Sequence, residues 1–184
     1  MDDGMKKLKE YTIQFVGLKT GIHHYDYQVN DEFFEFFEYD DFNHVDVKAN
    51  LELEKKPNML DLRFDIKGSI NINCDVTNEP FDQPIENSLE LVVKFGDEYN
   101  DEYEDLLILP HGEYELELQQ YIYEAIVLAI PYKRVHPGVE DGSLKSEMLD
   151  KLAELQPKQK EIKEEEEEID PRWNKLKKLL NDNK

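Results

Sequence analysis

Apolar and polar residues alternate strictly over residues 45–54, and this pattern constrains the fold more than any other feature of the chain. Val45, Val47, Ala49, Leu51 and Leu53 are the apolar members. A period of two places them on one face of a β-strand and the polar residues on the other. The alternation resumes from Leu60 to Cys74, with Gly68 as a bend or bulge, and again over residues 89–95 after a loop holding Pro80 and Pro84. The sequence therefore predicts a meander of three antiparallel strands.

Shorter patterns flank the meander. They predict short strands near residues 11–15 and 25–29, then a short helix capped by Asn30 or Asp31 with aromatic residues at 33, 34 and 37. Further along the chain, the pattern predicts an acidic loop over 96–105 and a strand over 106–109. A helix from Glu113 to Ile130 is expected next, with one side formed by Leu116, Tyr123, Val127 and Ile130. A loop over 136–143 and a helix over 146–155 follow.

These elements predict an α+β fold: an antiparallel β-meander or partly open barrel with flanking helices and a charged C-terminal tail ending in a short helix. We expect an acidic α+β domain over residues 1–155, a charged flexible linker over 156–168 and an amphipathic basic helix over 169–184. Five consecutive glutamates at 164–168 favour the linker, because like charges repel at helical spacing and cannot be buried.

The net charge of −21 is unevenly distributed along the 184 residues. Residues 1–154 carry 14 Lys and Arg against 35 Asp and Glu, whereas residues 155–184 carry eight of each. An anionic body repels phosphate backbones, so the composition disfavours a protein that coats nucleic acid. It suits a basic partner such as a ribosomal protein, or simply solubility.

The residue chemistry does not predict an enzyme or a metal protein. The five histidines are scattered, no phosphate-binding glycine loop or nucleophile elbow occurs, and the acidic loop lacks the order of a calcium loop. We therefore expect no catalytic residue, cofactor or metal. A single cysteine, Cys74, excludes an internal disulfide and indicates a reducing compartment. With no signal peptide and no membrane-length apolar run, we expect a cytoplasmic protein that does not bind membranes.

The C-terminal residues hold the densest basic cluster. Asp170 and Pro171 are typical of a helix start, and the predicted helix carries the candidate partner- or RNA-binding residues Arg172, Trp173, Lys175, Leu176, Lys177 and Lys178. Two readings remain open. The helix packs Trp173 on its own domain, or it docks its apolar stripe and basic rim on a ribonucleoprotein surface.

Three stretches resemble the DUF177 family, whose bacterial members are called YceD. They are Gly68–Ile70 running into Cys74–Phe81, then Glu124–Pro131, and finally Ile169–Trp173 with Leu176. The resemblance marks Cys74, Thr77, Pro80 and Phe81 as the family-motif turn. Many members carry a cysteine pair at that turn and a second pair after the helix-ending proline. Here Thr77 replaces one cysteine and residues 136–142 contain none, so packing and hydrogen bonds must hold the turn.

The resemblance implies a non-enzymatic ribosome-biogenesis factor that supports accumulation or processing of 23S, large-subunit, ribosomal RNA. Its partners would be large-subunit precursor rRNA, a basic ribosomal protein, or both. The sequence leaves open which of these is the direct ligand, and it leaves open the oligomeric state. The alternative is an acidic protein-interaction module unrelated to ribosomes, with its C-terminal helix packed in cis.

Overall fold

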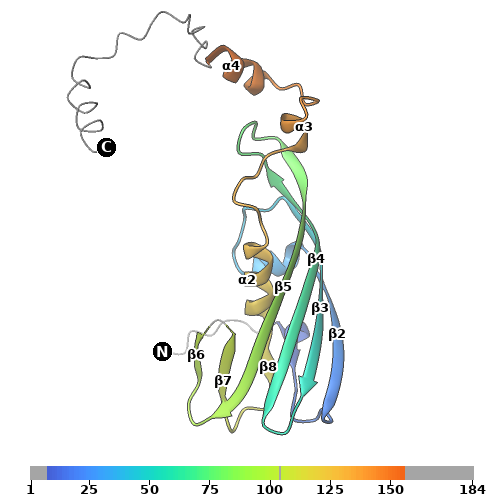
Figure 1. Ribbon diagram of the computed structural model, residues 1–184, viewed down its shortest axis with the longest axis vertical. Coiled ribbons are helices and arrows are strands. Elements are labelled where there is room, and N and C mark those ends of the chain that lie inside the picture. Colours follow the sequence, from blue (N-terminus) through green and yellow to red (C-terminus); the bar gives the residue numbers. More distant parts are fainter. Residues whose placement is uncertain (1–7, 104, 156–184) are drawn as a thin grey trace, which may run out of the picture. The chain divides into compact units, whose positions relative to one another are not determined.

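The computed structural model describes residues 8–103 and 105–155 (Figure 1). The chain divides into two units after Ser146, and each unit is described by itself. Within the described part of the second unit, α4 (Glu147–Leu155) agrees with the helix predicted over 146–155. The predicted linker 156–168 and basic helix 169–184 lie outside the described residues.

A six-stranded sheet with the order β2-β3-β4-β5-β7-β6 dominates the first unit. Its strands are β2 (Gly21–Val29), β3 (His44–Lys55), β4 (Met59–Asn73), β5 (Pro80–Gly96), β6 (Asn100–Tyr103) and β7 (Leu106–Pro110). The sheet does not close. β3, β4 and β5 form the predicted meander of three antiparallel strands, and β2 extends it by one more antiparallel strand. The predicted α+β class with a partly open sheet is therefore confirmed. The pattern did not predict that β7 runs parallel to β5, nor that β6 lies within the acidic loop.

The core lies on one face of this sheet. Every apolar residue of the alternating run in β3 is at most 2% exposed, as the sequence predicts. The short 3₁₀ helix η1 (Lys9–Tyr11), α1 (Asp31–Phe36) and α2 (Gln119–Leu128) contribute the buried side chains that pack against this apolar face. The opposite face carries the polar members of each strand and is open to solvent along β2–β5.

Gly68 does not mark a bulge. Pairing runs without a register shift through Val47, Gly68 and Ile85 on three adjacent strands. A Cβ atom on residue 68 would lie 2.3 Å from the carbonyl oxygen of Asp46 and 2.6 Å from the Cα atom of Val47. Glycine is needed here because the backbone of β3 approaches closely, not because the chain bends.

The predicted loop at Pro80 and Pro84 is wrong, because β5 extends through both prolines. Cys74 donates its N–H to the carbonyl of Glu79 at the start of the β4–β5 ladder. The odd-numbered residues of β5 therefore direct their backbone N–H and C=O groups toward β4. The even-numbered residues direct these groups away from β4, as Val92 shows by donating its N–H to the carbonyl of Asp105. Both prolines occupy outward-facing positions where β7 does not pair with β5, so they remove no ladder hydrogen bond.

The short aromatic helix is confirmed as α1. Asn30 caps it, with its side-chain oxygen accepting the N–H of Phe33, and both Phe33 and Phe34 are buried. Phe37, next along the chain, stacks on Tyr123 of α2 with ring centroids 4.3 Å apart. Aromatic contacts thus join α1 to α2 above the sheet.

The helix predicted over 113–130 begins later, at Gln119. Leu116 instead belongs to β8 (Leu116–Glu117), which pairs with β1 (Thr12–Ile13), and Leu118 donates its N–H to the carbonyl of Tyr11. This pairing with the N-terminal segment overrides the helical pattern. The buried face of α2 is Ile122, Ala125 and Ile126 with Gln119, rather than the predicted side.

We predict that Gly68→Ala destabilises the protein by about 1–3 kcal/mol, because β3 must shift to admit the methyl group. Urea unfolding followed by circular dichroism measures the change. Gly17→Ala is the matched control, since a Cβ there meets nothing within 4 Å. Equal stability of the two variants would refute the close-approach explanation.

Candidate functional site: the Cys74 junction and the charged surfaces

The turn between β4 and β5 meets the segment that follows α2. Asp75 donates its N–H to the carbonyl of Arg134 at 2.7 Å, and Arg134 returns its own N–H to the Asp75 carboxylate at 2.9 Å. Asn78, in the left-handed region with φ 59°, donates its N–H to the carbonyl of Cys74 and closes the turn. Two segments far apart in the sequence are thus held together by paired hydrogen bonds. We call this contact the Cys74 junction.

Cys74 lies at the centre of the junction and is 2% exposed. Its Sγ accepts the N–H of His136 at 3.3 Å. Burial alone would raise the pKa of the Cys74 thiol, but hydrogen bonds from His136, Thr77 and Val76 outweigh it, so the pKa lies below its usual value. Cys74 ends the apolar alternation that begins at Leu60, which agrees with its burial, and its sulfur serves as a hydrogen-bond acceptor between the two segments.

His136 completes the junction. Its Nδ1 accepts the N–H of Gly138 at 2.9 Å and caps the one-turn helix α3 (Pro137–Glu140). Its ring lies edge-on to Phe81, with centroids 5.5 Å apart. A Cβ on Gly138 would lie 2.9 Å from Leu144, so this segment is tightly packed.

The structure brings three of the four family-motif residues into this junction. Cys74, Thr77 and Phe81 are buried there, whereas Pro80 is exposed at the start of β5. Sequence reasoning did not select Arg134, His136 or Gly138. The available signal was the resemblance itself, which places a second cysteine pair in the region that here contains His136 and Gly138.

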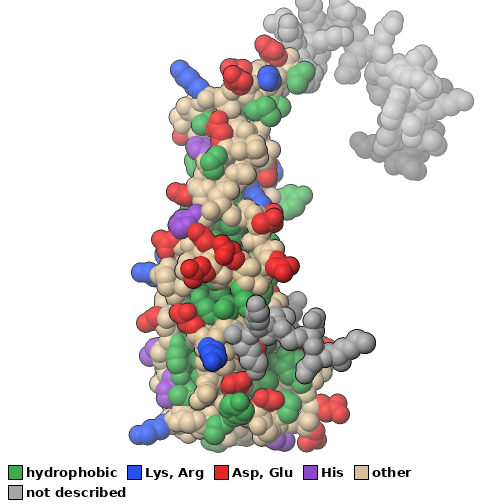
Figure 2. All heavy atoms as spheres, turned by 180° about the vertical axis from the view of Figure 1, so that it is seen from behind, with side chains coloured by type: hydrophobic (Ala, Val, Ile, Leu, Met, Phe, Trp, Pro, Cys, Tyr) green, Lys and Arg blue, Asp and Glu red, His purple; other side chains and the backbone are tan. Residues whose placement is uncertain are grey.

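The open sheet face is predominantly acidic. Its exposed and half-buried carboxylates are Asp26, Asp46, Glu52, Glu54, Asp61, Asp65, Asp82, Glu86 and Glu90. The cations among them are Lys48, Lys56, Arg63, Lys67 and Lys94. The space-filling view from the other side shows that acidic side chains are abundant there too (Figure 2).

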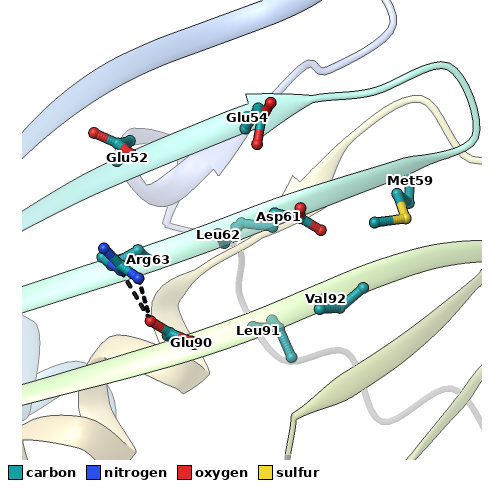
Figure 3. A pocket seen from close by; sticks show the side chains of 9 residues that line it. All are labelled: Glu52, Glu54, Met59, Asp61, Leu62, Arg63, Glu90, Leu91 and Val92. Atoms are coloured by element: carbon teal, nitrogen blue, oxygen red, sulfur yellow. Dashed lines mark hydrogen bonds and ion pairs between the residues drawn. The ribbon is translucent and has the colours of Figure 1, made fainter.

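An open depression of about 360 Å³ lies on this face, between β3, β4 and β5 (Figure 3). Arg63 reaches from β4 to Glu90 on β5, with Nη2 2.5 Å and Nε 3.0 Å from Oε1 (Figure 3). Lys56 bridges Asp61 and Glu54, leaving one buried oxygen of Asp61 without a hydrogen bond. The pKa of Arg63 is raised by its hydrogen bond to Glu90. These side chains form cross-strand ion pairs, which suit a charged contact surface.

Asp31 joins α1 to β3. Its carboxylate accepts the N–H of Val45 at 2.6 Å and lies 2.9 Å from Nδ1 of His44. Partial burial opposes ionisation of Asp31, but the hydrogen bonds from His44 and Val45 outweigh it and lower its pKa. The hydrogen bond between the Asp31 carboxylate and the His44 ring raises the pKa of His44 above its usual 6.5.

Several sequence predictions remain predictions. The candidate binding residues Arg172, Trp173, Lys175, Leu176, Lys177 and Lys178 lie outside the described residues. Over residues 8–103 and 105–155, no three His, Cys, Asp or Glu side chains are placed to hold a metal ion. In that same part of the chain, no helix has the length and hydropathy needed to cross a membrane.

We predict that Cys74→Ala costs about 1–3 kcal/mol of unfolding free energy, because buried donors lose their acceptor. Cys74→Ser retains an acceptor and should cost less. Chemical denaturation measures both, with the half-buried neighbour Val76→Ala as the control. A Cys74→Ala variant as stable as the parent would show that the sulfur does not hold the junction.

The ion pair between Asp31 and His44 predicts a pH dependence with a definite sign. Because the His44 pKa is raised, the contribution of its protonated form to stability is complete below pH 6.5 and disappears as the pH rises through the folded value. Because the Asp31 pKa is lowered, its contribution is present above its usual 3.8 and disappears as the pH falls through the folded value.

Asp31→Asn should lower the His44 pKa toward 6.5 while keeping an oxygen for the N–H of Val45. NMR titration of the His44 ring measures this shift. Asp46→Asn is the control, since Asp46 has a smaller effect on His44. An unchanged His44 pKa in Asp31→Asn would exclude the pair.

Comparison with known proteins gives one match. The sequence model of the family described as "Large ribosomal RNA subunit accumulation protein YceD" matches residues 62–180. Curated proteins and solved structures gave no match. The matched stretch contains both halves of the Cys74 junction and extends through the predicted basic residues of the tail. It covers well over half of the chain, which therefore belongs to the YceD family of large ribosomal RNA subunit accumulation proteins.

Proposed function

We propose that this protein is a non-enzymatic, cytoplasmic ribosome-biogenesis factor that supports accumulation or processing of 23S rRNA by binding. Its acidic body would hold a basic ribosomal protein during assembly. The tail residues Arg172–Lys178 would contact precursor rRNA or a protein groove. The family description supports the link to the large ribosomal subunit.

One observation supports the partner class most directly: carboxylates outnumber cations on the open sheet face. Its ion pairs, such as Arg63 with Glu90 and Lys67 with Glu86, join exposed side chains and leave other carboxylates without a cation. Such a surface attracts a basic protein and repels RNA. Ribosomal proteins that must reach anionic rRNA carry the complementary charge.

The charge division along the sequence supports two contacts of opposite sign. All excess negative charge lies in residues 1–154, whereas Arg172, Lys175, Lys177 and Lys178 are closely spaced. Each phosphate contact by such a cation releases a counterion, so tail binding to RNA would weaken steeply with salt. Body binding to a basic protein would also weaken with salt, but would not require RNA.

We predict that the full-length protein co-sediments with large-subunit precursors in sucrose gradients at low salt. Replacing the four tail cations with glutamine, together with Trp173→Ala, should reduce the co-sedimenting fraction by about fivefold or more. The control replaces Lys9, Lys19, Lys133 and Lys145 with glutamine; these four exposed lysines lie outside the open sheet face and make no ion pair with a described residue. Absence of the parent protein from precursor fractions, with normal 23S rRNA levels in a deletion strain, would contradict the function.

Hydrogen exchange over residues 169–180 distinguishes the two readings of the tail. Rapid exchange in the isolated protein is expected for a helix that docks on a partner. Strong protection would favour the alternative, an acidic module whose C-terminal helix packs in cis.

A further inference from the structure

A groove with an aromatic base and an acidic rim lies beside α1. It has a volume of about 450 Å³ and is built by α1, the loop over 38–43 and the start of β3. The aromatic residues are Phe34, which is 2% exposed, and the half-buried Tyr39 and Phe42, whose ring centroids are 4.8 Å apart. The exposed rim residues are Glu35, Glu38 and Asp40. We call this feature the acidic–aromatic groove.

The rim carboxylates lack cations. Glu35, Glu38 and Asp40 have no ion pair with any described residue, and no Lys or Arg occurs between Lys19 and Lys48 in the sequence. The neighbouring acids are engaged elsewhere. Asp31 contacts His44 and Val45, and Asp41 accepts the Tyr39 hydroxyl and lies 3.9 Å from Arg134. Three carboxylates without an ion pair to a described residue therefore line the groove beside the aromatic rings.

Glu38 occupies a position that local preferences disfavour. It follows the end of α1 in the left-handed region, with φ 53°, while Tyr39 donates its N–H back to the carbonyl of Phe34. Glycine is usual at this position of a helix-ending motif, and a carboxylate there also faces the negative end of the helix dipole. Local preferences are commonly violated where a residue serves recognition.

We propose that the acidic–aromatic groove binds an extended, arginine-rich segment of a partner protein. A guanidinium stacks on aromatic faces and pairs with carboxylates through its planar fork, so it matches both the base and the rim. A lysine ammonium matches the charge but not the planar geometry. An RNA strand would meet uncompensated carboxylates and be repelled.

This inference rests on the proposed function for the nature of the partner, a basic ribosomal protein. The groove itself precedes the family-matched stretch, since residues 31–45 lie before Leu62. It assigns the protein contact to a defined surface of the body, separate from the tail residues 172–178.

Fluorescence anisotropy at about 150 mM salt tests the groove with the full-length protein. The probe is a labelled octapeptide of alternating arginine and glycine, compared with the same peptide carrying lysine. We expect tighter binding of the arginine peptide. Glu35→Gln/Glu38→Gln/Asp40→Asn should weaken it by about tenfold, from the loss of three exposed charge contacts.

The matched control is Asp97→Asn/Glu98→Gln/Glu113→Gln, which removes the same charge from exposed residues outside the groove. It should change affinity by less than about twofold, since these exposed charges do not line the groove and salt screens their effect on the bound peptide. Tyr39→Leu keeps an apolar side chain and should reduce the preference for arginine over lysine. Equal weakening by both triple variants, or no preference for arginine, would overturn the proposal.

A third variant identifies a competing occupant. If neutralising Arg172, Lys175, Lys177 and Lys178 raises peptide affinity about tenfold, the chain's own tail fills the groove and the proposal is wrong; unchanged affinity supports an external partner. The peptide assay contains no ribosomal particles. Co-sedimentation with precursors without peptide binding would therefore contradict only the groove proposal. Peptide binding without co-sedimentation would support the groove proposal and contradict the ribosomal function.

Discussion

The antiparallel ladder of β3, β4 and β5 is the interaction on which the rest of the structure depends. Residues 60–71 of β4 pair with both β3 and β5, so each of them is fixed against two others. A slip of one residue would turn Leu62, Phe64 and Ile66 from the core to the solvent face, which makes the register strongly specified. The helices α1 and α2 then have one apolar surface to cover, and their positions follow from it.

The same ladder separates charge from the core. Because alternate residues face outward, the acidic residues of the strands are displayed together on the open face. Exposed cross-strand pairs such as Arg63 with Glu90 contribute little net stability, since water already solvates both partners well. In the proposed function, the carboxylates without a cation matter more than these pairs, because they set the sign of the electrostatic field that an approaching partner would meet.

The sequence predicted those features that periodic burial determines. The strands around residues 45–54 and 60–74, the capped helix at Asn30 and the buried Cys74 follow directly from local patterns. The failures involve long-range pairing. The local pattern places Leu116 in a helix because its strand partner Ile13 lies about a hundred residues away. It places Pro84 in a loop because nothing local shows that the outer side of β5 is unpaired there.

The candidate sites likewise combine features that the local sequence predicts with features that depend on long-range contacts. The family-motif turn was found from its resemblance, but its partners Arg134 and His136 become visible only when the fold brings them to Cys74. The acidic–aromatic groove was not anticipated, because an alternation of Phe and Glu in a short helix is equally typical of ordinary core packing. What distinguishes it is that Glu35, Glu38 and Asp40 line a groove with aromatic residues and make no ion pair with a described residue, which is a spatial property.

The family match begins at Leu62, within β4, yet that strand cannot be separated from what precedes it. Phe64 and Ile66 lie beside Leu51 and Ala49 of β3, so the matched strand shares its buried face with an unmatched one. Asp31 in turn fixes α1 to β3 through the N–H of Val45. The unmatched N-terminal residues therefore complete the fold while building a surface of their own. That surface is linked to the Cys74 junction, because Asn43 donates its side-chain N–H to Asn73 beside Cys74, and Asp41 lies 3.9 Å from Arg134.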